Sequence, residues 1–343
     1  MSNSIKVFII SFFLIVISLA SVFSTYKRHK SYQMQVFINS DVIRKNFESR
    51  NFDFINQIDV NYPSLNIFAM PMKSLKAEYL FAKDSVMQAI KLHEEGAKDN
   101  PYLMYSEANL AGIYQRMGLY DQFEFYARKA HKNLPNNPLH FVHMTRLLSS
   151  EGKIDSVFYN FHNMDAEVKK RDEQIWIMTL SAIVNDTALI NKYDGKKIAK
   201  EALGIFHTNP TVRLIHDYTL YGKENIELAS SLEKDGIELF QQGKARQGVA
   251  KIKNAIDLHP NFRQYYDNYI IANFDLSNYD NIDQISEKYM STFGQTSSNI
   301  LYRIAHSIYT VNEKERANAC NILKEMNSSD LFAFDLNNYK LCF

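Results

Sequence analysis

The chain of 343 residues is long enough to bury one large core or two moderate ones, and 46% of its residues are apolar. Glycine and proline number only 11 and 7, which indicates few tight turns and favours helices over a many-stranded sandwich. The 39 lysines and arginines nearly cancel the 38 aspartates and glutamates, whereas nucleic-acid binders usually have a basic surplus, so we expect no nucleic-acid partner.

The first predicted element is a membrane anchor over residues 1–29. Residues 7–23 (VFIISFFLIVISLASVF) carry no charge, and with their flanks they reach the ~20 residues that a helix needs to cross a bilayer. A cleaved signal peptide is the main alternative, because Ser18 and Ala20 are small residues at the spacing that a signal peptidase prefers. The basic cluster at residues 27–30 would hinder export after such a cut, and a buried core helix fits poorly because the segment has no polar face. An uncleaved anchor is therefore the prediction.

The charges beside the anchor give a prediction for the side of the membrane. Lys6 precedes the apolar run, whereas Lys27, Arg28 and Lys30 follow it. The positive-inside rule then leans towards a cytoplasmic soluble part. Short N-terminal anchors often export their domains regardless, so the periplasmic side stays open. The predicted localisation is a single-pass membrane protein with the lipid bilayer as one partner.

Residues 30–69 are predicted to form a connecting helix and the first turn of a solenoid, and beyond them the sequence repeats with a period of about 34 residues. The clearest unit is residues 104–137. A glycine in this unit can take the left-handed conformation that ends a first helix, and a proline stops the second helix. Small and aromatic residues between them suit two closely packed helices. The residues at these positions are Ala111, Tyr114, Gly118, Tyr120, Ala127, Ala130 and Pro135.

This pattern resembles the tetratricopeptide repeat (TPR) family over residues 70–171 and 229–296. The resemblance implies an all-α fold: a TPR-like solenoid of helical hairpins, wound as a right-handed superhelix and preceded by one transmembrane helix. Residues 172–228 are predicted to be a degenerate repeat with an insertion. Residues 297–343 are predicted to be capping helices and a tail, because the end of a stack must face water.

A second, weaker resemblance concerns the anchor together with residues 100–122 (NPYLMYSEANLAGIYQRMGLYDQ). These segments are similar to the helical tail of membrane-bound O-oligosaccharide polymerases and ligases. Those proteins carry many membrane spans and catalytic loops before the tail. This chain has one span and none of that region, so their catalytic activity is not carried over.

The sequence contains few residues in patterns that indicate catalysis or cofactor binding. It has no glycine-rich phosphate loop, HExxH, CxxC pair or GxSxG elbow, and we predict neither a cofactor nor enzymatic activity. His140 and His143 could share a helix face, but nothing nearby supplies a third metal ligand, so no metal site is predicted. Cys320 and Cys342 are expected to be ordinary thiols, with a disulfide as the alternative.

The better site candidates are polar residues at the positions where the first helix of a TPR hairpin lines the concave groove. A glycine there would leave room for a ligand backbone, a tyrosine offers an apolar face with a hydroxyl, and asparagine or arginine could bind a peptide or its carboxylate. The candidate groove residues are Tyr105, Asn109, Gly112, Gln115, Arg116, His143 and Arg146. The carboxylate clamp of chaperone-binding TPR proteins is not predicted, because Leu75 and His143 occupy equivalent places in the neighbouring units.

The predicted function is a non-catalytic, membrane-anchored scaffold or adaptor that binds a segment of a partner protein in this groove. The alternative is an accessory subunit of a glycan polymerase or ligase, or of another envelope-assembly complex. An enzyme would need a clustered set of titratable groups, and the sequence shows none.

Overall fold

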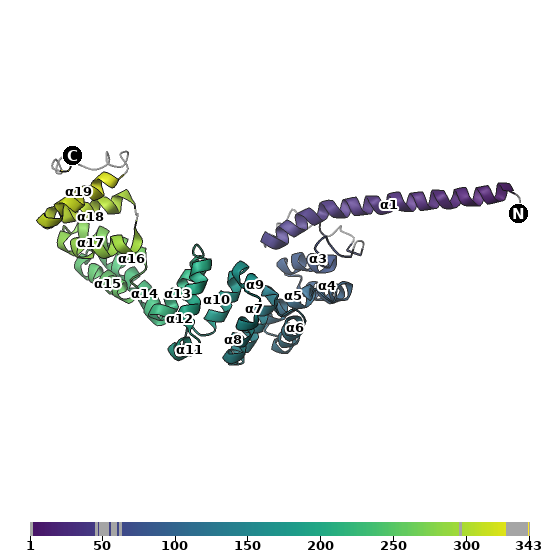
Figure 1. The fold of residues 1–343 in the computed structure, drawn as a ribbon, viewed down its shortest axis with the longest axis horizontal. Helices are drawn as coiled ribbons and strands as arrows, with labels where there is room; N and C mark the ends of the chain where they lie inside the picture. Colours follow the sequence, from purple (N-terminus) through teal and green to yellow (C-terminus); the bar gives the residue numbers. More distant parts are fainter. Residues whose placement is uncertain are drawn as a thin grey trace. The chain divides into compact units, whose positions relative to one another are not determined.

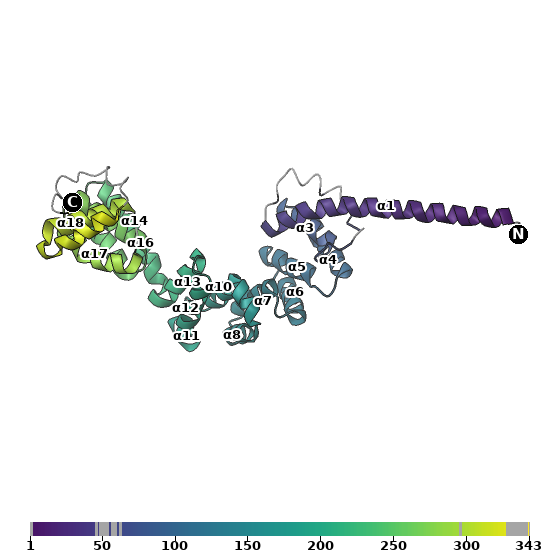
Figure 2. The same ribbon diagram turned by 45° about the horizontal axis from the view of Figure 1, so that its top comes forward.

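The computed structural model describes residues 3–44, 47, 55, 60–61, 64–294, 297–326 and 342. Within these ranges the chain is helical, and the only β-type pairing is an isolated bridge between Leu65 and Pro71. The chain divides into two compact units, residues 1–182 (unit 1) and residues 183–343 (unit 2). Figures 1 and 2 show successive helices paired side by side within each unit. The all-α fold of TPR-like helical hairpins predicted from the sequence is confirmed.

Unit 1 begins with one long helix and continues with three hairpins, α3–α4, α5–α6 and α7–α8. Its helices are α1 (Asn3–Arg44), α3 (Met72–Ala82), α4 (Val86–Asp99), α5 (Tyr105–Arg116), α6 (Tyr120–Asn133), α7 (Pro138–Ser150), α8 (Ile154–Asn163), α9 (Ala166–Arg171) and α10 (Glu173–Ser181).

Unit 2 contains the hairpins α14–α15, α16–α17 and α18–α19, preceded by shorter helices. Its helices are α11 (Thr187–Lys192), α12 (Gly195–Ile205), α13 (Pro210–Tyr221), α14 (Lys223–Gln241), α15 (Ala245–Leu258), α16 (Arg263–Asp275), α17 (Tyr279–Phe293), α18 (Ser298–Val311) and α19 (Arg316–Glu325), with the 3₁₀ turn η1 (Glu313–Glu315) before α19.

The turn inside five of the six hairpins is made by one residue in the left-handed conformation, and the α18–α19 turn instead contains the 3₁₀ turn η1. Asp84, Gly118 and Gly152 lie 34 residues apart in unit 1, and Gly243 and Ser277 lie 34 residues apart in unit 2; each has a positive φ. The backbone reverses there because this conformation ends the first helix within a few residues. The repeat period of the sequence is thus a physical period of chain reversals.

Polar caps and prolines set where the next hairpin begins. Asn137 and Asn209 each accept backbone N–H groups through the side-chain oxygen, and Pro138 and Pro210 follow as the first helical residues. The fixed φ of proline suits this position, which needs no N–H donor. The chain therefore leaves a second helix and enters a new first helix over a short loop.

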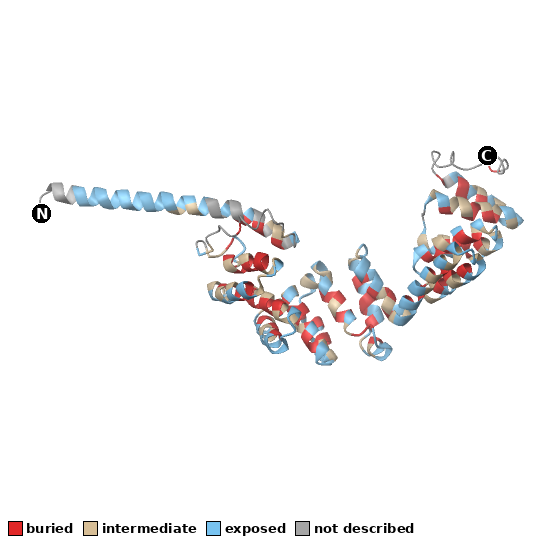
Figure 3. Ribbon diagram, turned by 180° about the vertical axis from the view of Figure 1, so that it is seen from behind, coloured by how far each residue is buried: buried red, intermediate tan, exposed pale blue. Residues whose placement is uncertain are grey.

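Helix α1 has two parts with different surroundings. Residues Phe8–His29 form a stretch of 22 residues with a mean hydropathy of 2.4, none of it buried, which is long and apolar enough to cross a membrane. Figure 3 shows this stretch as exposed and the last turns of the helix as partly buried. In these turns Ile38 and Val42 pack on α3, and Tyr79 Oη donates a hydrogen bond to Asp41 Oδ2 at 2.6 Å. The apolar stretch therefore runs directly into the folded unit.

The core of unit 2 is a continuous cluster of buried aliphatic and tyrosine side chains from α14 to α19. It includes Tyr266 and Tyr289, both fully buried, with Tyr289 Oη donating to Asp267 Oδ1 at 2.7 Å. The helices α14 and α15 meet at Gly236 and Gly248, where each glycine lies against the backbone of the other helix. Glycine is needed at both positions because a larger side chain would separate the helices.

The expectation of two ordinary thiols is wrong: Cys320 and Cys342 form a disulfide, with Cα atoms 4.9 Å apart. Cys320 lies on α19, and the chain returns to this helix at Cys342, which is 4% exposed. Sequence spacing could not show this pairing, because it does not say that Cys342 lies against α19.

Candidate functional site

The predicted groove residues lie on the neighbouring helices α5 and α7, the first helices of two successive hairpins. The structure separates them into two groups. Tyr105, Asn109, Gly112 and His143 take part in packing between helices, whereas the ends of Arg116 and Arg146 reach the surface. Gln115 joins the two helices, as described below.

The first group is engaged inside unit 1. Tyr105 Oη donates to the carboxylate of Glu78 on α3, and Asn109 Nδ2 donates to the carbonyl oxygen of Tyr105 at 3.0 Å. Burial, followed by the negative charge of Glu78, raises the pKa of Tyr105 above its ordinary value. The Tyr105–Glu78 bond therefore holds α5 against α3, whereas the Asn109 bond lies within α5.

The space beside Gly112 is filled by an imidazole. A Cβ atom added to Gly112 would lie 3.3 Å from His143 Cε1, so the glycine accommodates His143 of the next hairpin. The ring of His143 also meets Phe123 of α6 edge-on, with centroids 6.3 Å apart. The room that the sequence predicts for a ligand backbone is thus occupied by this side chain.

His143 is uncharged in the folded protein at neutral pH. Burial, assisted by the positive charge of Arg146, lowers the pKa of His143 to about 4. Its Nδ1 atom is buried and has no hydrogen-bond partner among the residues that the structure describes. The positive charge of this face therefore comes from arginine and not from histidine.

The second group consists of two arginines, each held by the preceding hairpin. The guanidinium carbon of Arg116 lies 5.2 Å from the ring centroid of Phe81 on α3. Arg146 Nη1 donates to Gln115 Oε1 on α5 at 3.2 Å. Each guanidinium group is thereby held by a side chain of the preceding hairpin, and we call Arg116, Arg146 and their supports Phe81 and Gln115 the arginine face.

Within the described part of the chain neither Arg116 nor Arg146 forms an ion pair with an acidic side chain. A guanidinium presents its donors in a rigid fork that matches the two oxygens of a carboxylate. The arrangement can therefore bind an acidic group supplied from outside the chain.

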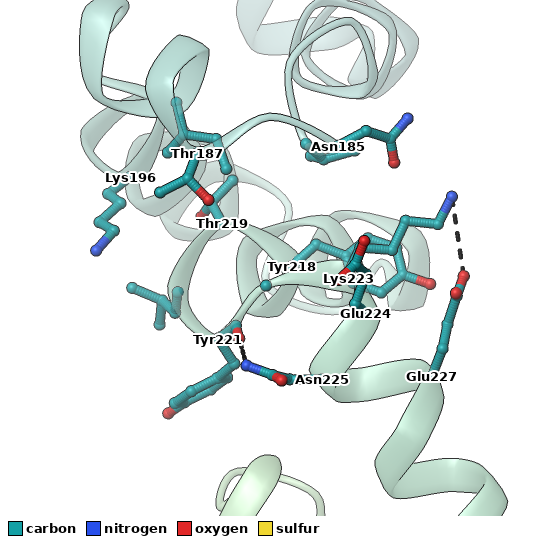
Figure 4. Close-up of a pocket in the computed structure, with 14 residues that line it drawn as sticks. Asn185, Thr187, Lys196, Tyr218, Thr219, Tyr221, Lys223, Glu224, Asn225 and Glu227 are labelled. Carbon is teal, nitrogen blue, oxygen red and sulfur yellow. Dashed lines mark hydrogen bonds and ion pairs between the residues drawn. The ribbon is translucent and has the colours of Figure 1, made fainter.

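A pocket lies in unit 2 (Figure 4), with a volume of about 570 Å³. Its wall is formed by residues 184–190 together with the end of α13 and the start of α14. Lys223 Nζ lies 3.8 Å from Glu227 Oε1, and Asn225 Nδ2 donates to the carbonyl oxygen of Tyr221 at 2.8 Å. Lys196 and Glu224 also line the pocket, so it carries charges of both signs and favours no particular class of ligand.

A cluster of titratable groups near the same helices, formed by Asp217, His216 and His259, joins two helices. Asp217 on α13 accepts from His216 Nδ1 at 3.3 Å and from His259 Nε2 at 3.1 Å, and His259 packs against the rings of Tyr221 and Phe262. Burial favours a higher pKa for Asp217, but the hydrogen bonds from the two histidines outweigh it, so the net pKa is below the ordinary value. The cluster ties α13 to the end of α15. Sequence analysis missed it because its members are 42 residues apart.

Metal ligation finds no support in the geometry. No group of three or more histidine, cysteine, aspartate or glutamate side chains within the described residues is arranged to hold a metal ion. His140 and His143 also fail to converge: His140 Nδ1 faces the carbonyl oxygen of Leu134 at 3.3 Å, while His143 lies over Gly112.

Comparisons with known proteins bear on the fold alone. No protein-family model and no curated protein sequence matches the chain. Among solved structures it is similar to a tetratricopeptide repeat protein from Parabacteroides merdae, with 13% identity, a TM-score of 0.38, and coverage of 79% of this chain and 95% of that chain.

Two further similar structures are of human IFIT1. The IFIT1 dimer with PPP-AAAA has 13% identity and a TM-score of 0.30, over 74% of this chain and 57% of that chain. A monomeric IFIT1 mutant with m7Gppp-AAAA has 12% identity and a TM-score of 0.34, over 80% of this chain and 62% of that chain. These likenesses are too remote to argue from; the hairpins and their regular turns define the fold as TPR-like. Nothing in the comparisons supports the resemblance to polymerase and ligase tails.

Proposed function

We propose that the protein is a non-catalytic, membrane-anchored scaffold that binds an acidic segment of a partner protein on the arginine face of unit 1. The observation that carries the proposal is the pair of oriented guanidinium groups, Arg116 and Arg146, without a carboxylate partner in the described chain. Stacked hairpins expose their first helices as one extended surface, which is the usual way in which such repeats bind peptides. No observation favours a role as a subunit of a glycan polymerase or ligase.

The expected binding energy comes mainly from charge-assisted hydrogen bonds. Such a bond contributes about 1.5–3 kcal/mol, so loss of one arginine should weaken binding by about tenfold or more. Asn109 is less suited to direct contact, because its amide already donates to the carbonyl oxygen of Tyr105. The proposal therefore assigns recognition to Arg116 and Arg146, with Gln115 and Phe81 as positioning residues.

The test is selection of peptides from a randomised displayed library against the full-length protein in nanodiscs. We expect enriched peptides to contain aspartate, glutamate or a free C-terminal carboxylate, and to lose binding to an Arg116→Gln/Arg146→Gln variant. The matched control is Arg246→Gln, which removes an exposed arginine from α15 in unit 2. Enriched peptides without acidic groups, or with equal affinity for the double variant and the control, would contradict the proposal.

We also propose that the two units lie on the oxidising, extracytoplasmic side of the membrane. The support is the Cys320–Cys342 disulfide, because such bonds persist in oxidising compartments and are rare in the cytosol. The positive charges after the anchor favour the cytoplasmic side instead, but this evidence is weaker, since large domains are exported largely regardless of flanking charge. A C-terminal tag should be lost when protease is added to cells with an opened outer envelope and an intact inner membrane. Protection of the tag under those conditions would place the units in the cytoplasm.

A further inference from the structure

The direction of α1 shows which edge of the first hairpin faces the anchor. Gln35 Oε1 accepts a hydrogen bond from the backbone N–H of Ile67 at 3.2 Å, and Asp41 Oδ2 accepts from Tyr79 Oη at 2.6 Å. Gln35 is the nearer of the two to the membrane stretch, and Ile67 precedes α3 whereas Tyr79 lies late in it. The loop before α3 is therefore on the anchor side of the hairpin.

The end of α4 lies at the same edge. Asn100 Nδ2, just after α4, donates to the carbonyl oxygen of Ala69 at 2.8 Å, and Lys73 Nζ lies 3.0 Å from Asp99 Oδ2. These contacts join the start of α3 to the end of α4, as expected of an antiparallel pair. Residues 64–71 and 100–103 thus form one edge directed towards the anchor.

This edge presents large apolar side chains to solvent. Ile67 is 65% exposed, Phe68 is 56% exposed and Tyr102 is 85% exposed. The loop that carries the first two is well fixed, because Asn66 Oδ1 accepts the backbone N–H groups of Phe68 at 2.9 Å and Met70 at 2.8 Å. The apolar side chains therefore point outward from an ordered turn that does not need them for its own packing.

The edge lies within reach of the bilayer surface. The membrane stretch ends at His29, and Gln35 follows six residues later, which is about 9 Å along a helix. The polar layer of a bilayer is about 5–8 Å thick on each side. Side chains on a helix lean towards its N-terminus, which brings the loop bonded to Gln35 closer to that layer.

We propose that this edge, formed by Ile67, Phe68 and Tyr102, docks into the interfacial layer of the leaflet from which the anchor emerges. Aromatic and apolar side chains are favoured at that depth. The exposed Lys98, in the last turn of α4, adds attraction to anionic headgroups. The lipid surface covers the exposed apolar side chains, and the first hairpin is held in a fixed orientation to the membrane. The proposal rests on the membrane anchor of the proposed function.

The experiment uses the full-length protein in phosphatidylcholine–phosphatidylglycerol nanodiscs. Single cysteines are introduced by Phe68→Cys and Tyr102→Cys and labelled with an environment-sensitive fluorophore, while Cys320 and Cys342 stay in their disulfide. Phe125→Cys is the matched control, because Phe125 is a similarly exposed phenylalanine on α6, away from this edge. Phe13→Cys reports on the membrane stretch itself. Circular dichroism checks that each variant is folded.

Docking predicts that lipids with a nitroxide near the headgroup quench the labels at residues 68 and 102 and leave the label at residue 125 unchanged. The label at residue 13 should be quenched by lipids with a nitroxide deep in the acyl chain. Quenching at residue 13 together with no loss of intensity at residues 68 and 102 would refute docking and leave the anchor intact. No quenching at residue 13 would refute the anchor and the docking that depends on it.

Discussion

The contact between α14 and α15 allows a sharp test of the packing in unit 2 by the substitution Gly248→Ala. A Cβ atom at this position would overlap the carbonyl oxygen of Gly236 and lie 3.1 Å from the backbone nitrogen of Phe240. Both obstacles are backbone atoms, which cannot rotate aside as a side chain can. The helices must therefore move apart if alanine is to fit.

The magnitude follows from two opposing effects. Alanine is favoured over glycine inside a helix by about 1 kcal/mol. Overpacking a tight contact costs about 1–3 kcal/mol, and here it would also loosen Ile252, which is 1% exposed in the same interface. We expect the second effect to win and Gly248→Ala to lower the free energy of unfolding by about 1–2 kcal/mol.

The matched control is Gly204→Ala in α12. Gly204 is also helical and lies in the same unit, but a Cβ atom there would meet nothing within 4 Å. Only the helix-propensity effect remains, so this variant should gain about 0.5–1 kcal/mol. The two identical substitutions are thus expected to change stability in opposite directions.

The assay is urea denaturation of the full chain in detergent micelles, followed by far-ultraviolet circular dichroism. Because hairpins of a solenoid can unfold separately, hydrogen exchange of peptides from α14 and α15 gives the local free energy as a second measurement. If Gly248→Ala stabilises the protein as Gly204→Ala does, the two glycines are not in contact and the packing described for α14 and α15 is wrong.

Three further predictions concern titration and the disulfide. His143 has a folded pKa of about 4 against about 6.5 unfolded, so its neutral form contributes stability that is fully present above pH 6.5 and lost as the pH falls towards 4. The loss is up to about 3 kcal/mol of the free energy of unfolding. In denaturant titrations at a series of pH values, His143→Gln should lose less of its free energy of unfolding between about pH 6.5 and 4 than wild type does. Asp217→Asn removes the charge that holds His216 and His259, and should lower the free energy of unfolding at neutral pH by about 1–3 kcal/mol; thermal melts that match wild type would contradict this. Because the pKa of Asp217 is below its ordinary value, the ionised carboxylate should stabilise the wild-type protein at neutral pH. This stabilisation should be lost in strong acid, as the pH falls through the folded pKa. Cys320→Ser/Cys342→Ser opens a link between residues 22 apart and should cost about 3 kcal/mol, measured as faster hydrogen exchange in α19, whereas unchanged exchange would show that the bond adds no stability.

The turns show how far the sequence predicts the fold. Gly118, Gly152 and Gly243 mark chain reversals that can be read directly, because glycine has no penalty in the left-handed conformation. Asp84 and Ser277 occupy the same place in their hairpins, and their residue types are common in turns but also common elsewhere in helices and loops. They become recognisable only when the period is measured from the glycines.

In the candidate site, the sequence predicts the face on which a residue lies but not the side chains that it contacts. The repeat positions of Arg116 and Arg146 indicate the face on which they lie, and the structure adds their supports Phe81 and Gln115. The same positional reasoning predicts an open space at Gly112, but a histidine from the next hairpin fills it. Position within a repeat specifies the direction of a side chain but not which neighbouring side chain meets it.

Glu107 illustrates the same limit. It stands where a TPR unit usually has a large apolar residue, and the sequence gives no reason for a carboxylate there. In the structure it is 1% exposed, and its Oε1 lies 3.1 Å from Lys129 Nζ on α6. An ion pair between the two helices of the hairpin thus takes the place of apolar packing, and it depends on a residue in the other helix.

The proposed binding at the arginine face and the proposed membrane anchor together have a consequence for the kind of partner that such a scaffold would retain. The net charge of the chain is +1, so long-range attraction contributes little, and at physiological salt charges are screened beyond about 8 Å. Two arginines provide only a few charge-assisted bonds, and the cost of association offsets much of their energy, so binding in solution should be weak. Confinement of both partners to one membrane raises their effective concentration and makes weak contacts sufficient. We therefore expect this face to hold a partner anchored in the same bilayer more firmly than the same acidic segment free in solution.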